Sequence, residues 1–93
     1  MYMRITSMSY DPGREGELMA IADAARDEMK GIEGLQSNRT VWVSDGKLII
    51  CAAYNTEASA NAAMPKSQGI LGNLAAVLTA PAEVQESPVI WEL

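Results

Sequence analysis

The chain has 93 residues, which is room for one domain spanning residues 1–93. Its net charge is −5 and its seven basic residues are scattered, so neither nucleic acid nor an anionic membrane is expected as a partner. Histidine is absent, and the single cysteine, Cys51, allows no internal disulfide and no metal-ligand spacing, so we expect no metal or other cofactor.

The first five residues show neither the basic nor the apolar region of a signal peptide. No apolar run approaches the roughly 18 residues that a membrane-spanning helix needs. We therefore expect a soluble protein of the cytoplasm.

A strand is predicted from Tyr2 to Tyr10, followed by a helix. Met3 and Ile5 fall on one face of the strand, and the other face consists of Tyr2, Arg4, Thr6, Met8 and Tyr10. Asp11-Pro12-Gly13 ends the strand and opens the helix, because Asp11 can cap it and Pro12 suits its first turn. The apolar stripe of this helix consists of Leu18, Ile21, Ala22, Ala25 and Met29, and the helix ends at Lys30-Gly31.

A hairpin is predicted from Leu35 to Tyr54. Asp45-Gly46 lies between two β-rich runs and favours a tight turn in which both central residues have positive φ. A two-residue loop there pairs Val43 with Leu48, Trp42 with Ile49 and Asn38 with Ala53.

The second strand of this hairpin, Leu48–Ala53, is apolar at every position. A strand without a polar face is covered on both sides, which predicts a central position in the sheet. Because helices cover only one face of such a sheet, the other face requires a second cover. A partner subunit would provide it, and a chain this short buries only roughly 60–65% of its unfolded surface without one.

A second helical stretch is predicted from Glu57 to Met64, capped by Asn55 or Thr56 and interrupted by Pro65. Ser67 can cap a continuation that ends at Ala80-Pro81, with an apolar stripe made of Ile70, Leu71, Leu74, Val77 and Leu78.

The last run, Glu83–Leu93, is predicted to be a strand in which Val89, Trp91 and Leu93 share a face. Pro88 confines this strand to an edge or a bulge, because proline has no N–H to donate.

The element order β-α-β-β-α-β predicts an α+β, ferredoxin-like fold with an antiparallel sheet and two helices on one face. Three stretches of the sequence point to one family within this fold: Asp11-Pro12-Gly13, Gly34-Leu35, and Tyr54-Asn55-Thr56-Glu57-Ala58. With these the chain resembles the dimeric α+β barrel proteins, and among them the antibiotic biosynthesis monooxygenase (ABM) domains. In that family the third stretch commonly reads Trp, a polar residue, a capping Ser or Thr, an acid and Ala, and here Tyr54 replaces the Trp.

The resemblance implies a homodimer whose sheets pack face to face across a two-fold axis, with a ligand cleft between the sheet and the helices of each subunit. The haem-degrading members of the family use an Asn, a Trp and a His. Their positions fall near Thr6, Ala63 and Asn73 or Leu74, and none of them matches. Haem degradation is therefore not expected.

The cofactor-independent members imply a different site, an apolar cleft for a phenolic substrate with hydrogen-bond donors and positive charge that stabilise a carbanion. The candidate ligand-binding residues are Arg4, Thr6, Asn38, Arg39, Trp42, Tyr54 and Asn73. Each has a structural alternative: Arg4 can form an ion pair and Trp42 can anchor a core or an interface. Asn38 and Arg39 face opposite sides of their strand, so only one of them can line a given cleft.

Two functions remain open, and no catalytic residue is identified. The first is a cofactor-independent monooxygenase acting on a small aromatic or quinol-like metabolite. The second is a non-enzymatic small-molecule-binding or stress-associated dimer of the same fold, which the absence of histidine and of an acid–base pair favours.

Overall fold

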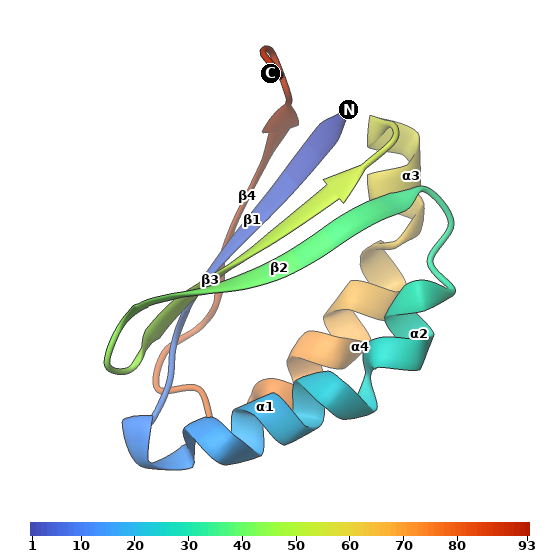
Figure 1. The fold of residues 1–93 in the computed structure, drawn as a ribbon. Coiled ribbons are helices and arrows are strands. Elements are labelled where there is room, and N and C mark those ends of the chain that lie inside the picture. The colour runs from blue at the N-terminus through green and yellow to red at the C-terminus, as the bar shows by residue number, and fades with distance from the viewer.

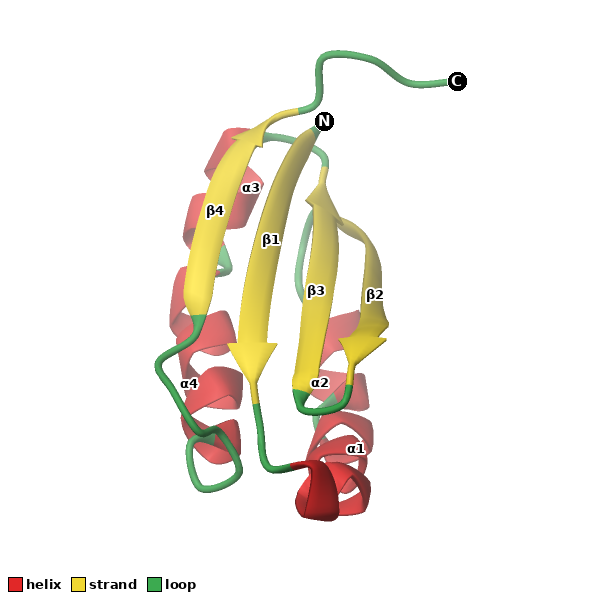
Figure 2. Ribbon diagram, turned by 90° about the vertical axis from the view of Figure 1, so that its left-hand side faces the viewer, coloured by secondary structure: helices red, strands yellow, loops and turns green.

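The computed structural model describes residues 1–93 as one four-stranded antiparallel sheet with all of its helices on one side (Figures 1 and 2). The strands are β1 (Tyr2–Ser9), β2 (Leu35–Ser44), β3 (Lys47–Tyr54) and β4 (Glu83–Pro88), in the sheet order β2-β3-β1-β4. The helices are the short 3-10 turn Pro12–Arg14, α1 (Glu15–Ala24), α2 (Arg26–Lys30), α3 (Glu57–Ala62) and α4 (Met64–Leu74). The predicted α+β, ferredoxin-like fold is confirmed, and β3 is a central strand as expected.

Local sequence signals explain where the 3-10 turn and α3 begin. The Asp11 carboxylate accepts a hydrogen bond from the Gly13 N–H at 2.9 Å, and the Thr56 hydroxyl accepts one from the Ser59 N–H at 3.1 Å, so Thr56 is the cap of α3. Pro65 lies in the first turn of α4, where a missing N–H costs nothing. None of the helices combines the length and the hydropathy that crossing a membrane requires.

The second helical stretch ends earlier than predicted. The helix α4 stops at Leu74 rather than near Ala80, and its N-terminal cap position is Ala63, without a side-chain hydrogen bond from Ser67. Val77 is nevertheless buried, because the turn after α4 carries it back into the core.

Gly34 supplies the left-handed backbone that joins α2 to β2. Its φ is +83°, and a side chain here would collide with the Ser59 side chain. The Gly34 carbonyl accepts a hydrogen bond from the Asn55 N–H at 2.8 Å, which fixes the start of β2 against the end of β3.

The hairpin has the predicted two-residue loop, but the predicted turn and register are wrong. Only Gly46 has positive φ (79°). A bulge between Trp42 and Ser44 takes Val43 out of the pairing, so Trp42 lies opposite Leu48 and Asn38 lies opposite Ala52. Because a shift of one residue exchanges the two faces of a strand, the bulge moves Asn38 to the helix-covered face.

The C-terminal strand is shorter than predicted. It ends at Pro88, and the next residue keeps one hydrogen bond, from the Val89 N–H to the Met1 carbonyl at 2.9 Å. Trp91 is 74% exposed and Leu93 is fully exposed, so the face that they were expected to share with Val89 does not form. Pro88 does lie on an edge strand, as its missing N–H requires.

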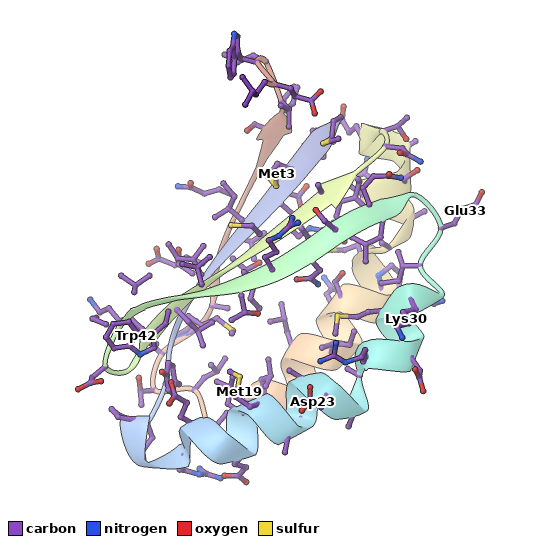
Figure 3. All side chains as sticks on the ribbon, viewed as in Figure 1. Met3, Met19, Asp23, Lys30, Glu33 and Trp42 are labelled. Atoms are coloured by element: carbon purple, nitrogen blue, oxygen red, sulfur yellow. The ribbon has the colours of Figure 1, made fainter.

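The core lies between the sheet and the helices and consists of two clusters. The first is Met8, Tyr10, Leu18, Leu48, Leu74 and Val77, and the second is Ile32, Ala52, Tyr54, Ala60 and Ala63. No helix or loop covers the other face of the sheet, called here the bare face, where Figure 3 shows Met3. Its central residues Met3, Ile5, Ile49 and Cys51 are half-buried by their neighbours alone.

Replacing Leu18 with Ala tests the first cluster. Leu18 is 2% exposed, so the substitution leaves a cavity and should lower the free energy of unfolding by about 2–5 kcal/mol in urea titrations. Met19→Ala is the matched control, because Met19 is 39% exposed on the same helix and should change stability little. Equal effects of the two substitutions would contradict the assigned helix orientation.

Candidate functional site

A cavity of about 100 Å³ lies between the helix-covered face of the sheet and the helical layer. It is bounded by residues of both core clusters, and ten of its fifteen lining residues are hydrophobic. The polar side chains that line it are Arg4, Thr6, Asn38, Thr40 and Ser67, together with the hydroxyl-bearing Tyr54. An apolar cavity with a few convergent polar groups is the usual form of a small-molecule site.

The sheet register explains why polar and small residues meet here. Arg4 and Thr6 are two positions apart on β1 and therefore share a face. Arg4 lies between Ala52 of β3 and Glu86 of β4, its partners on the two neighbouring strands. The short side chain of Ala52 leaves open space on the β3 side of Arg4.

Arg4 is 5% exposed and donates four hydrogen bonds. Its Nε donates to Glu86 Oε1 at 2.8 Å, and its Nη1 donates to Tyr54 Oη and to Ser67 Oγ, both at 3.0 Å. Its Nη2 donates to the Ala60 carbonyl at 2.7 Å. The guanidinium thus joins β1 to β3, β4, α3 and α4, and four of its five N–H groups are used.

Two outer hollows adjoin the cavity. The β2-side hollow, about 470 Å³, lies between the edge strand β2 and the helices α1 and α2, and Figure 3 labels Met19, Asp23 and Lys30 of its lining. The β4-side hollow, about 540 Å³, lies between α4 and β4. The cavity shares five lining residues with the first hollow, whereas Arg4, Ser67 and Leu71 form its shared wall with the second.

Four of the seven candidate ligand-binding residues line the cavity: Arg4, Thr6, Asn38 and Tyr54. The other three do not. Arg39 lies opposite Cys51 on the bare face, Trp42 is 60% exposed near the hairpin tip (Figure 3), and Asn73 is exposed on α4.

Sequence reasoning missed Glu86 and Ser67, the partners of Arg4. A buried arginine is expected to have a carboxylate near it. The chain has twelve acidic residues, and only the pairing of β4 with β1 identifies Glu86 as the partner. Ser67 was expected to cap a helix, and its hydroxyl instead accepts from Arg4.

The cavity lining holds no carboxylate, thiol or imidazole. Its two titratable side chains are Arg4 and Tyr54, and the Tyr54 hydroxyl accepts from Arg4, which leaves its own proton to donate to a ligand. No group of three or more His, Cys, Asp and Glu side chains is placed to hold a metal ion. The cavity can therefore bind and orient a molecule through hydrogen bonds, but none of its own side chains is an ordinary general base.

The groups with shifted pKa lie outside the cavity lining. Burial, and then the charges of Glu57 and Glu86, raise the pKa of Tyr2. The hydrogen bond to Glu15 at 2.7 Å, followed by burial, raises the pKa of Tyr10. On the surface, the Arg14–Glu17 hydrogen bond lowers the pKa of Glu17.

The sheet order, the helices on one face and the cavity between the two layers define a ferredoxin-like α+β fold. No model of a protein family matches the sequence, and no curated protein is similar to it in sequence. Similarity is found among solved structures.

Three of these structures illustrate the likeness. A protein of Nitrosomonas europaea, whose name assigns it to the antibiotic biosynthesis monooxygenases, is 14% identical with a TM-score of 0.82, over 98% of this chain and 100% of that one. A protein of Deinococcus radiodurans with the same assignment is 8% identical with a TM-score of 0.83, over 100% and 96%. SnoaB of Streptomyces nogalater, described as a cofactor-independent oxygenase, is 12% identical with a TM-score of 0.80, over 99% and 95%.

At these identities the likeness shows the fold and carries no activity over to this chain. The chain has the fold of the ABM domains, so the resemblance predicted from the sequence is confirmed at the level of the fold.

A double-mutant cycle of Arg4→Met and Glu86→Gln tests the buried ion pair. Each single substitution leaves a partly buried group without its partner, and Arg4→Met should cost about 3–5 kcal/mol of unfolding free energy. We expect a coupling energy of about 1–3 kcal/mol, because the double variant removes both charges. The same cycle on Arg26 and Asp23, which are 64% and 69% exposed, should give only about 0.2–0.5 kcal/mol. Similar couplings in the two cycles would show that the Arg4 pair is solvated.

Proposed function

We propose that this chain binds a small aromatic or quinol-like metabolite between its sheet and its helices and oxygenates it without a metal or flavin. The observation that carries the proposal is the apolar cavity with converging Tyr54, Thr6 and Asn38 side chains. The shared fold with SnoaB, described as a cofactor-independent oxygenase, supports the reaction type.

The reaction requires no external reductant. A ring-activated CH₂ group loses a proton to water, and the resulting carbanion gives its electrons to O₂ and forms a C–O bond. The peroxide anion takes a proton back, and the hydroperoxide that forms loses water. In sum, one CH₂ group and one O₂ give one carbonyl group and one H₂O. The cavity contributes hydrogen-bond donors for the oxyanion of the ionised substrate and apolar walls that limit water.

One observation favours the second candidate, a non-enzymatic ligand-binding protein. The cavity lining has no ordinary general base, and the charge of Arg4 is already balanced by Glu86 at 2.8 Å. Oxygenation then depends on a substrate acidic enough to ionise with hydrogen-bond donors alone. A less acidic molecule would be bound and released unchanged.

Oxygen uptake distinguishes these two candidates. With anthrone and anthrone-type phenols, an oxygenase consumes O₂ above the buffer rate. A binding protein instead shows a raised melting temperature without uptake. The absence of both effects across the panel would refute the two functions together.

Filling the cavity provides the matched variant for that experiment. Ala22 lines the cavity, and Ala22→Leu should abolish uptake or thermal stabilisation by occupying the ligand's space. Ala20→Leu makes the same change on the exposed side of α1 and should leave both signals unchanged. A ligand response that survives Ala22→Leu would place the ligand elsewhere.

We also propose that the chain acts as a homodimer with its bare faces packed together. The support is the apolar centre of that face, where Ile5, Ile49 and Cys51 have no cover within one chain. An exposed apolar face of this kind on a small domain is typical of an interface.

Ile5→Lys tests the dimer. The lysine points from β1 into the bare face, so it should convert a particle of about 20 kDa into one of 10.0 kDa in light scattering, because a buried unpaired charge disrupts the interface. Ala24→Lys adds the same charge at an exposed site of α1 and should leave the mass unchanged. A wild-type chain of 10.0 kDa at micromolar concentration would contradict the proposal.

A further inference from the structure

The interior of the cavity offers no free charge to a ligand. Its one ionic side chain, Arg4, is paired with Glu86 at 2.8 Å and has four of its N–H groups engaged. An anion placed beside Arg4 would have to displace that carboxylate, and a cation would find no carboxylate in the cavity lining. A ligand therefore presents its uncharged part to the cavity.

The cavity is also too small to hold a whole ligand of metabolite size. About 100 Å³ falls well short of the roughly 300 Å³ at which ligand pockets begin. The β2-side hollow continues the same space, because five residues line both: Ala22, Met29, Leu35, Asn38 and Thr40. A bound molecule can thus extend outward along β2 into about 470 Å³ of additional room.

Positive charge is concentrated in this hollow. Lys30 and Arg26 line it together with one acid, Asp23. Arg26 donates to Asp23 at 2.8 Å through Nη2 and keeps its other N–H groups, and Lys30 forms no ion pair. The other acids of α2, Asp27 and Glu28, do not line the hollow.

The β4-side hollow has a different character. Its charged lining residues are Arg4 and Glu86, which are paired with each other. The β2-side hollow therefore has one more positive than negative side chain in its lining, next to the apolar cavity, although the whole chain has a net charge of −5.

We propose that the ligand of this site is an aromatic acid, with its ring in the cavity and its carboxylate in the β2-side hollow beside Lys30 and Arg26. This inference rests on the proposed binding of an aromatic metabolite and specifies the class of that metabolite. Asn38, whose Nδ2 lies 3.3 Å from Met29 Sδ at the junction of the two spaces, lies between the ring and the carboxylate of such a ligand.

The test compares two probes of the same shape by calorimetry, 2-naphthoate and its neutral amide, 2-naphthamide. Solvent-exposed ion pairs are weak, so we expect the wild-type chain to bind the acid roughly two- to five-fold more tightly than the amide at low salt. Salt at 0.5 M should reduce this preference, because it screens exposed charges. The double variant Arg26→Gln/Lys30→Gln should lose the preference for the acid, because Asp23 then remains as the one charged residue of the hollow lining. Lys66→Gln, at an exposed site on α4 outside both spaces, should keep the preference.

Each outcome bears on a different claim. Equal binding of both probes by the wild-type chain, or a preference that persists in the double variant, overturns the acid assignment and leaves the cavity as the binding site. Binding that Ala22→Leu does not weaken overturns the placement of the ring. If neither probe binds, the acid assignment fails, and oxygen uptake with anthrone decides the fate of the proposed function separately.

Discussion

The fold depends on one buried cation. Arg4 lies near the middle of β1, and a guanidinium removed from water is costly unless its charge and its N–H groups are matched. The match is assembled from four other elements: Glu86 of β4, Tyr54 of β3, Ser67 of α4 and the Ala60 carbonyl at α3. Two of these partners lie on helices joined through Ala63, and the break there directs both helices toward the same side chain. The sheet, the helical layer and the position of the edge strand are therefore coupled through one residue.

This coupling limits the chemistry of the adjoining cavity. An arginine that holds the fold together cannot also offer a free charge to a ligand, and the hydrogen bonds that satisfy it close the cavity toward β4. The polar groups of the cavity lining that Arg4 leaves free are the Tyr54 proton, Thr6, and Asn38 and Thr40 of β2. In the proposed complex, the charged group of the ligand lies outside the cavity, in the hollow beside β2 that shares five lining residues with it. The hydrogen bonds that engage Arg4 at one end of the cavity thus leave the end beside β2 for the charged group of the proposed ligand.

The sequence predicted the features that short-range chemistry determines. Asp11-Pro12 and Thr56 mark helix starts, and Pro65 marks the interruption of the second helical stretch, because caps and prolines act on their own neighbours. Features that depend on distant pairing were missed. The bulge at Val43 arises from how β2 lies on β3, and the pairing of Glu86 with Arg4 requires the β1–β4 register. Four of the candidate residues line the cavity, whereas Arg39, Trp42 and Asn73 do not. The side of the sheet on which a side chain lies, and its exposure, depend on strand register and packing rather than on residue type.

The bulge in β2 determines which of its residues lie on each side of the entirely apolar strand β3. With Val43 out of the pairing, Asn38 and Thr40 lie on the side of Ala52 and Ile50, while Arg39 and Val41 lie on the side of Cys51 and Ile49. The alternate residues of β3 therefore serve two surfaces: Leu48, Ile50 and Ala52 contact the core or line the cavity, and Ile49, Cys51 and Ala53 lie on the bare face. A polar residue on either set would weaken one surface without affecting the other. The uniform hydrophobicity of Leu48–Ala53 thus reflects two separate surfaces, and the helices cover only the first of them.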